Sequence, residues 1–264
     1  MTYTLIRLDI RSRIATLTLS DVAHRNRMSL QMRSECMSAL NSLEKDGKAD
    51  CVIITGEGTE AFSAGADINE VKTRTPKEEF SAKAQLRRKL PFRLESLCLP
   101  SVASINGWCL GAGLELALAC TLRIAAETAR IGLPEINLGV IPGSGGTQRL
   151  ARLIGMGRAM EMITLGEPIS AEEAYRIGLV NAIVPQDRLL DAAEDICRKW
   201  QAKGPVSLIA ARDAVLRGAD MNLKAGIEYE RKLFATCLAS GERDEGVAAF
   251  LEKRKPKFRK NDKP

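Results

Sequence analysis

Short apolar strands alternate with helical segments through about the first 140 residues, and few folds accommodate that order of elements. Leu5–Ile10 and Ile14–Leu19 alternate apolar and polar residues, as paired antiparallel strands do. Cys51–Thr55, Ser101–Ile105 and Leu122–Ala126 are further short apolar runs. Because helical patterns separate these runs, the sequence predicts an α/β fold in which β-β-α turns stack on one another.

Helices are expected between these strands. Ser29 is placed to cap a helix that continues to about Asp46. The charge and leucine spacing of Lys77–Ser96 is typical of a surface helix. Gly107–Gly113 is interpreted as a tight loop that opens into an almost wholly apolar helix, Leu114–Cys120.

Strand signals end near Asp187, and the rest of the chain is helical in pattern. The expected helices are Leu189–Lys203, Val206–Leu216, Leu223–Ala239 and Arg243–Lys253. We therefore expect an α/β core with the active site over residues 1–195 and a helical region over residues 196–264. A helical extension of this kind often makes subunit contacts, and its basic tail is expected to fray.

Composition excludes several classes of protein. No apolar run approaches the ~20 residues of a membrane span, and the N-terminus lacks a secretory or transit pattern, so a cytoplasmic location is expected. Seven cysteines are scattered without a Cys-x-x-Cys pair, which disfavours a disulfide framework. With His24 as the single histidine, a zinc site is not expected, and no metal is assigned.

The formal charge of +6 is compatible with nucleic acid, with a multiply phosphorylated small ligand or with plain solubility. Aromatic residues make up 4% of the chain and do not interleave with basic ones, which disfavours base stacking. Arg25 and Arg27 precede the first long helix and are either part of a solvated turn or an anion contact. The basic run Arg87-Arg88-Lys89 is the candidate RNA-binding patch, against the simpler interpretation of a solvated helix face.

Two glutamates stand in the most apolar, glycine-rich parts of the chain. Glu115 lies in Gly111–Cys120, and Glu135 lies in Ile131–Gly139. Burying a lone carboxylate costs several kcal/mol unless something offsets it. If the two side chains share a pocket, they form a pair that can hold a water molecule and transfer its protons.

Glycine-rich loops next to these acids could present backbone N–H groups to a ligand. A helix that begins after Gly111-Ala112-Gly113 directs free N–H groups toward its N-terminus, although the same residues also suit a plain turn with Glu115 in the first helical turn. Phe62–Asp67 is a second such segment, or a plain loop. Gly139–Arg149 is rich in glycine but matches neither a P-loop nor a dinucleotide fingerprint. Ser144 lacks the setting of a hydrolase nucleophile.

Taken together, these motifs resemble the enoyl-CoA hydratase/isomerase (crotonase) superfamily. The matching segments are Ala64–Ile68, Asn106-Gly107, Leu110–Ala117, Leu133–Gly139, Pro142–Leu150, Glu245-Gly246 and Ala249–Arg254. The resemblance implies a crotonase-like β-β-α spiral, a helical C-terminal region that forms trimers or dimers of trimers, and an acyl-CoA thioester as substrate. It implies no separate cofactor, because coenzyme A is part of the substrate.

The resemblance also implies site residues. The backbone N–H groups of Ala66 and Ala112 correspond to the oxyanion hole, although the family usually has Gly at the place of Ala112. Glu115 and Glu135 correspond to the catalytic acids, and some relatives have Lys at the place of Asn69. The residues expected to contact substrate are Arg25, Arg27, Ala64, Ala66, Asp67, Ile68, Asn69, Gly111, Gly143, Phe234 and Lys253.

Both acids together favour a hydratase, because many isomerases of the superfamily keep one. The expected reaction is reversible hydration of a 2-enoyl-CoA to a 3-hydroxyacyl-CoA, in a setting such as fatty acid degradation. An enoyl-CoA isomerase, or a hydratase for branched, cyclic or glutaconyl-type acyl groups, is the alternative. An RNA-binding protein with the same fold, or an inactive member, is less favoured. The acyl-group preference is not set by these motifs.

Overall fold

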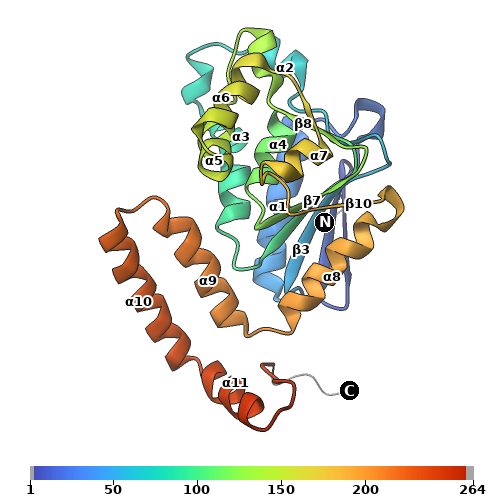
Figure 1. Cartoon of the computed structure of the whole chain (residues 1–264). Coiled ribbons are helices and arrows are strands. Elements are labelled where there is room, and N and C mark those ends of the chain that lie inside the picture. Colours follow the sequence, from blue (N-terminus) through green and yellow to red (C-terminus); the bar gives the residue numbers. More distant parts are fainter. Residues whose placement is uncertain (1–2, 260–264) are drawn as a thin grey trace.

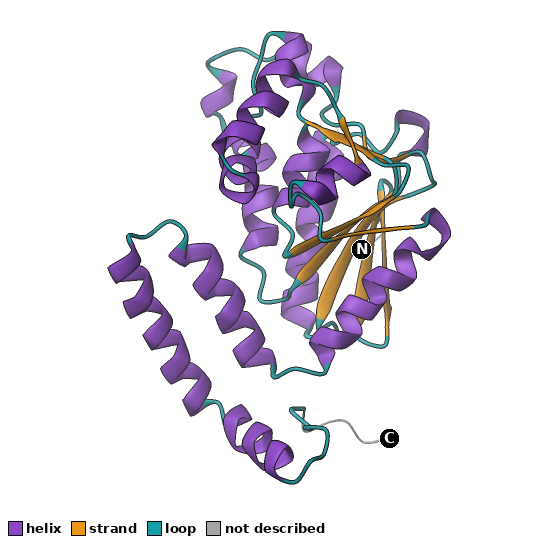
Figure 2. Cartoon of the chain, viewed as in Figure 1, coloured by secondary structure: helices purple, strands orange, loops and turns teal. Residues whose placement is uncertain are grey.

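A six-stranded sheet forms the base of the fold in the computed structural model, which describes residues 3–259 (Figures 1 and 2). Its strands are ordered β1-β2-β3-β5-β7-β10. β1 runs antiparallel to β2, and all other neighbours in this sheet are parallel. Their bounds are β1 (Ile6–Arg11), β2 (Ile14–Leu19), β3 (Cys51–Gly56), β5 (Ser101–Ile105), β7 (Leu122–Ala126) and β10 (Ala182–Val184). The five strands predicted from the sequence all belong to this sheet.

A second, four-stranded sheet carries the loops that face the cavity described below. It contains β4 (Ala61–Ser63), β6 (Trp108–Leu110), β8 (Arg130–Gly132) and β9 (Ile169–Ser170), in that order. The prediction of a tight loop over Gly107–Gly113 is therefore wrong in part, because residues 108–110 pair in parallel with β4 and with β8. A strand of three residues is too short to leave a period-2 pattern in the sequence.

Helices cover both faces of the large sheet and extend beyond it. Their bounds are α1 (Leu30–Asp46), α2 (Ile68–Lys72), α3 (Ala82–Glu95), α4 (Ala112–Leu118), α5 (Gly146–Ile154), α6 (Met156–Leu165), α7 (Ala171–Arg176), α8 (Leu189–Gln201), α9 (Pro205–Gly218), α10 (Leu223–Ala239) and α11 (Glu242–Leu251). Short 3-10 turns are η1 (Val22–His24), η2 (Glu78–Phe80), η3 (Pro134–Leu138) and η4 (Gln186–Arg188). As predicted, the Ser29 side chain caps α1 by accepting from the Met32 N–H.

The central strands are apolar on both faces because helices pack on each side. Val52 and Ile54 of β3 belong to the main core, which also contains residues of α1, α3 and α4. Cys51 and Ile53 point to the other face, where they meet Ala193 and other residues of α8. The six-stranded sheet is thus a buried platform that fixes where its strands end and where the loops begin.

The helix α3 is less of a surface helix than its charges suggest. Leu90 and Leu94 are fully buried, and Arg87 is only 6% exposed, while Lys89 is exposed. Arg87-Arg88-Lys89 is therefore not a continuous basic surface, which corrects the candidate RNA-binding patch. A stretch with one buried guanidinium presents too few phosphate contacts for the electrostatic binding that RNA requires.

The C-terminal helices extend away from the rest of the chain (Figure 1). α9 and α10 form an antiparallel hairpin, and α11 follows below it. The expected domain boundary between residues 195 and 196 falls inside α8, which packs on the large sheet, so the extending helices begin at α9. Among residues 3–259, none of the helices combines the length and the apolar composition that a membrane span requires.

Candidate active site

A cavity of about 770 Å³ opens between the second sheet and the helices above it. Four segments form most of its wall: residues 64–68, 111–115, 134–144 and the arginine-bearing face of α3. The sequence-predicted residues that line it are Ala64, Ala66, Ile68, Gly111, Ala112, Glu115, Glu135 and Gly143. The fold therefore brings together the two isolated glutamates and both segments predicted to present N–H groups.

Glu115 is held rigidly at one side of the cavity. It lies in α4 and is 3% exposed. Its Oε1 atom accepts hydrogen bonds from the Ser144 N–H at 2.6 Å and from the Gly146 N–H at 2.9 Å. These N–H groups stand at the start of α5, where the helix dipole favours a negative charge. Glu115 also lines the cavity.

Glu135 is held differently, because the hydrogen bond that acts on its carboxylate comes from its own backbone N–H. It lies in η3, and its Oε2 atom is buried without a hydrogen-bond partner among the described residues. Gly111 lies against this carboxylate, since a β-carbon on Gly111 would stand 2.9 Å from Glu135 Oε1. Burial, and to a smaller extent the charge of Glu115, raises the pKa of Glu135 to about 7. Glu135 can therefore hold or release a proton near neutral pH.

The backbone N–H groups of Ala66 and Ala112 lie on the cavity wall, and neither donates a hydrogen bond to any other described residue. Met28 forms a parallel bridge with Ala66 and donates to Gly65 O at 2.7 Å. In a parallel pair, the groups of the bridged residue itself point away from the partner, so the Ala66 N–H faces away from Met28. Ala112 begins α4, and its N lies only 3.8 Å from the β-carbon position of Gly65.

Four arginines also line the cavity, and sequence reasoning gave none of them a role there. Arg33 comes from α1, Arg74 follows α2, and Arg87 and Arg88 come from α3. Ser144 connects Glu115 to the backbone of Arg87, because its N–H donates to the Glu115 carboxylate and its hydroxyl donates to Arg87 O at 3.3 Å. For Arg33 and Arg87, the sequence signal that could have indicated a buried position is an arginine on an otherwise apolar stripe of a helix.

Other predicted residues lie outside this cavity wall. Arg25 pairs with Glu60 at 2.7 Å, and Arg27 pairs with Asp67 at 3.1 Å. Asp67 also caps α2 by accepting from the Asn69 N–H at 2.9 Å. These residues surround the segment that follows Ala66, so they remain next to the cavity although they do not line it.

Phe234 and Lys253 lie on the extending C-terminal helices. Phe234 is 63% exposed in α10, and Lys253 is exposed just after α11. Neither residue lines the cavity of its own chain. Any role of theirs at a cavity requires a second copy of the chain.

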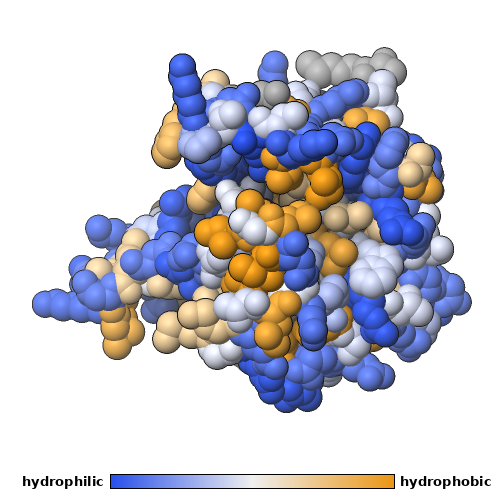
Figure 3. Space-filling model, turned by 90° about the horizontal axis from the view of Figure 1, so that it is seen from above, coloured by the Kyte–Doolittle hydropathy of each residue, from blue (hydrophilic) through white to orange (hydrophobic). Residues whose placement is uncertain are grey.

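Apolar side chains surround the entrance of the cavity. Leu138, Val140 and Ile141 line the cavity and are exposed in this chain. Figure 3 shows apolar residues gathered in the middle of the upper face, with hydrophilic residues around them. A polar interior with an apolar entrance suits a ligand that carries an apolar linker to a reacting polar group.

Known proteins resemble the chain over nearly its whole length. A family model described as enoyl-CoA hydratase/isomerase matches residues 9–261. The 2,3-dehydroadipyl-CoA hydratase of Escherichia coli (strain K12) is 39% identical, covering 94% of this chain and 96% of that protein. The short-chain-enoyl-CoA hydratase of Clostridium acetobutylicum is 37% identical, covering 96% and 97%. A crystal structure of enoyl-CoA hydratase from Bacillus anthracis has a TM-score of 0.91 at 38% identity, covering 97% and 99%.

Proposed function

The chain belongs to the enoyl-CoA hydratase/isomerase family, and from that premise we propose how its cavity adds water to a 2-enoyl-CoA thioester. The protein is an enoyl-CoA hydratase, a hydro-lyase with the crotonase-like fold that the sequence predicted. The reaction is the reversible addition of water, which gives the 3-hydroxyacyl-CoA. The observation that carries the proposed mechanism is the presence of both Glu115 and Glu135 on one cavity wall.

The thioester oxygen binds the N–H groups of Ala66 and Ala112. Both groups line the cavity and are free of other described hydrogen bonds. The oxygen gains negative charge as the enolate-like transition state forms, so donors fixed in place stabilise the transition state more than the substrate. Losing one such donor costs about 10²–10³ in rate in other enzymes. The Ala at position 112 keeps the backbone donor that glycine would supply.

The two glutamates divide the proton transfers. The raised pKa lets Glu135 carry the proton that it donates to C2. Glu115, fixed by two N–H groups, orients the water and accepts its proton as the oxygen bonds to C3. After the step Glu115 holds a proton and Glu135 is ionised, so the protons balance and the reverse reaction uses the same pair. Gly143 leaves room for the water or acyl group. These groups need neither a metal nor an organic cofactor.

Coenzyme A lies along the segment from Ala64 to Asn69, with Arg25 and Arg27 near its phosphates. The support for this placement is that Ala64, Ala66 and Ile68 line the cavity. The Arg27–Asp67 ion pair keeps this segment close to the turn after η1. The formal charge of +6 favours a polyanionic ligand in general.

The proposed assembly is a homo-oligomer, a trimer or a dimer of trimers, held together by α9–α11. Leu223, Phe234 and Phe250 are large apolar residues that these helices expose in the single chain. Exposed apolar residues that cluster on one region mark an interaction site. A neighbouring copy would bring Phe234 and Lys253 toward coenzyme A. A cytoplasmic location and a place in fatty acid degradation remain predictions from the sequence.

Crotonyl-CoA tests the function directly. The purified protein is expected to consume it with loss of the enoyl-thioester absorbance, and Glu115→Gln and Glu135→Gln are each expected to lose at least ~10²-fold in kcat. An isomerase would instead convert a 3-enoyl-CoA to the 2-enoyl-CoA without adding water. Absence of turnover with every short 2-enoyl-CoA would overturn the hydratase assignment. Near-normal hydration by either variant would remove the role given to that residue.

A further inference from the structure

Besides Arg88, which pairs with Glu79, the hydration mechanism leaves three arginines on the cavity wall without a role. Arg33 is 2% exposed and Arg87 is 6% exposed, while Arg74 is half-buried. All three line the cavity that holds Glu115 and Glu135. Burying a guanidinium is costly unless an anion and hydrogen bonds compensate, so the partners of each one decide what it does.

Arg33 has an internal role. Its Nε donates to Met28 O at 3.2 Å, and its Nη1 donates to Arg87 O at 2.9 Å. Burial lowers the pKa of Arg33 to about 10, with the nearby charge of Glu115 acting in the opposite direction. Arg33 thus positions the backbone of α3 and adds positive charge beneath the cavity.

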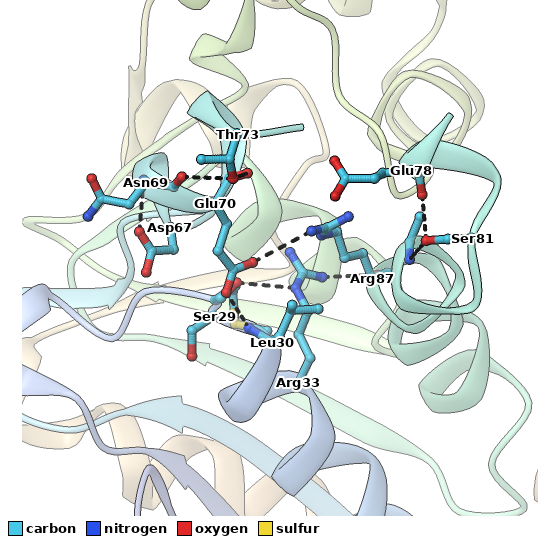
Figure 4. A network of polar contacts seen from close by, with 12 residues as sticks. Ser29, Leu30, Arg33, Asp67, Asn69, Glu70, Thr73, Glu78, Ser81 and Arg87 are labelled. Carbon is cyan, nitrogen blue, oxygen red and sulfur yellow. Dashed lines mark hydrogen bonds and ion pairs between the residues drawn. The ribbon is translucent and has the colours of Figure 1, made fainter. Parts of the chain in front are cut away.

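The guanidinium groups of Arg87 and Arg74 lack hydrogen bonds of this kind. The nearest anion to Arg87 is Glu70, whose Oε2 lies 3.9 Å from Nη2, beyond hydrogen-bond distance, while Glu70 Oε1 accepts from the Leu30 N–H. Arg87 Nε is buried without a hydrogen-bond partner among residues 3–259, and so is Arg74 Nε. Figure 4 shows Arg33 and Arg87 pointing toward each other from α1 and α3, with Glu70 on the side of Leu30.

The electrostatics point the same way. Burial, followed by the positive charge of Arg87, lowers the pKa of Arg74. Two guanidinium groups that repel each other while both keep a buried, unpartnered Nε form a site that an anion would complete. The cavity volume leaves space for such an anion beside the acids.

The position of this site favours one source for the anion. The charge of Glu115, the carboxylate proposed to activate water, acts on both Arg33 and Arg74. Ser144 also joins Glu115 to the backbone carbonyl of Arg87. The acyl group, which extends from a thioester bound at Ala66 and Ala112, shares this cavity with Arg74 and Arg87, so an anion carried on that group would reach them.

We propose that Arg74 and Arg87 bind a carboxylate at the far end of the acyl chain, so that the preferred substrate is a 2-enedioyl-CoA, the monothioester of an unsaturated dicarboxylic acid. This inference rests on the hydratase function proposed above and names its substrate class. Arginine suits the role because its planar fork can pair with a carboxylate through two hydrogen bonds.

The test compares matched substrates on the intact protein. A series of 2-enedioyl-CoA thioesters is assayed against the half-amides of the same acids, which have the same shape without the charge. At the best chain length, kcat/KM is expected to favour the carboxylate by about 10- to 100-fold. Equal values across the series, with crotonyl-CoA still hydrated, would overturn the carboxylate site alone. Loss of hydration with every substrate would overturn the hydratase function as well.

Variants locate the effect. Arg74→Met is expected to reduce the ratio of kcat/KM for the carboxylate to that for the half-amide at least ~10-fold, and Arg74→Lys is expected to restore part of that ratio. Lys89→Met, an exposed cation of the same region, is the matched control and is expected to keep the full preference. The phosphates of coenzyme A are the alternative anion for this site, and inhibition of each variant by free coenzyme A tests them. If Arg74→Met weakened the binding of free coenzyme A as much as the binding of the enedioyl substrate, the arginines would bind the phosphates of coenzyme A and the proposal would be wrong.

Binding without turnover provides a second readout for Arg87. A saturated dicarboxylyl-CoA should inhibit the wild-type protein more strongly than its half-amide, and Arg87→Met should make the two inhibition constants similar. Circular dichroism checks that Arg87→Met is folded. A folded Arg87→Met that keeps the full difference between the two inhibitors would contradict the role of Arg87.

Discussion

The carboxylate of Glu135 lies against the α-carbon of Gly111, with room for hydrogen but not for a methyl group. A β-carbon on Gly111 would stand 2.9 Å from Oε1 and 3.4 Å from the carboxyl carbon of Glu135. Gly111 also has a φ of 50°, a conformation that side chains disfavour. It immediately precedes Ala112, one of the two proposed oxyanion donors. One glycine therefore sets the position of an acid and of a donor.

Gly111→Ala is expected to lower kcat by about 10²-fold, because a displaced acid and donor no longer match the reacting atoms. Backbone strain at positive φ should cost a further ~1–2 kcal/mol of stability. Gly178→Ala is the matched control, since Gly178 has a φ of 78° and nothing within 4 Å of its β-carbon position. The control should lose similar stability in denaturant melts and keep its kcat. Similar kcat losses in both variants would mean that strain, not displacement, is the cause.

The raised pKa of Glu135 predicts how the hydration rate depends on pH. Glu135 must be protonated to donate to C2, and its pKa in the folded protein is about 7. The kcat/KM for hydration should therefore fall about tenfold per pH unit above that pH. Stopped-flow or steady-state assays of crotonyl-CoA hydration across the range test this. A rate that rises through neutral pH would contradict the assignment of Glu135 as the acid.

The same group predicts a change in stability. An acid whose pKa is raised in the folded state, here from 4.5 to about 7, binds more protons when folded than when unfolded between these pH values. Its ionisation then destabilises the fold as pH rises through that window. Glu135→Gln should be about as stable as wild type near pH 4 and more stable above pH 7, by on the order of 2 kcal/mol. Urea melts at the two pH values measure the difference, and a constant difference would refute it.

The sequence predicted the large sheet well because its strands are buried on both faces. Cys51–Thr55 and Leu122–Ala126 are apolar runs for which few other structures are plausible, and both are strands of the sheet. The second sheet was missed where its strands have only two or three residues, as in β6 and β9. Such strands depend on neighbours brought close by tertiary structure, which no local pattern records.

Both glutamates were predicted from the sequence as site residues, because an acid is conspicuous in an apolar segment, and both line the cavity. Arg33 and Arg87 carried a similar signal that was not used. Arg33 precedes Cys36, Leu40 and Leu43 at helical spacing, and all are buried on one stripe of α1. Arg87 stands in the same spacing before Leu90, Leu94 and Leu97, which are also buried. That the two charged positions meet in one cavity could not be read from either helix alone.

Glu115 is expected to separate catalysis from stability. In Glu115→Gln the amide oxygen can still accept from Ser144 N and Gly146 N, so the fold should be kept while kcat falls at least ~10²-fold. Glu115→Ala removes the acceptor as well and leaves two buried N–H groups unpaired, which should cost about 1–3 kcal/mol each. Thermal melts and kcat of the two variants provide the comparison. A Gln variant as unstable as the Ala variant would show that the charge itself holds the start of α5.

The extending helices predict that the protein depends on other copies of itself. Phe250 of α11 is 83% exposed in the single chain. If it is buried in the proposed assembly, Phe250→Asp places a charge in an apolar contact and should shift the protein toward monomer. Light scattering after gel filtration measures the mass of the species. Leu190→Asp, on the exposed side of α8, is the control that should keep the assembly. A wild-type protein that is monomeric across micromolar concentrations would remove the proposed assembly, and with it the route by which Phe234 and Lys253 reach coenzyme A.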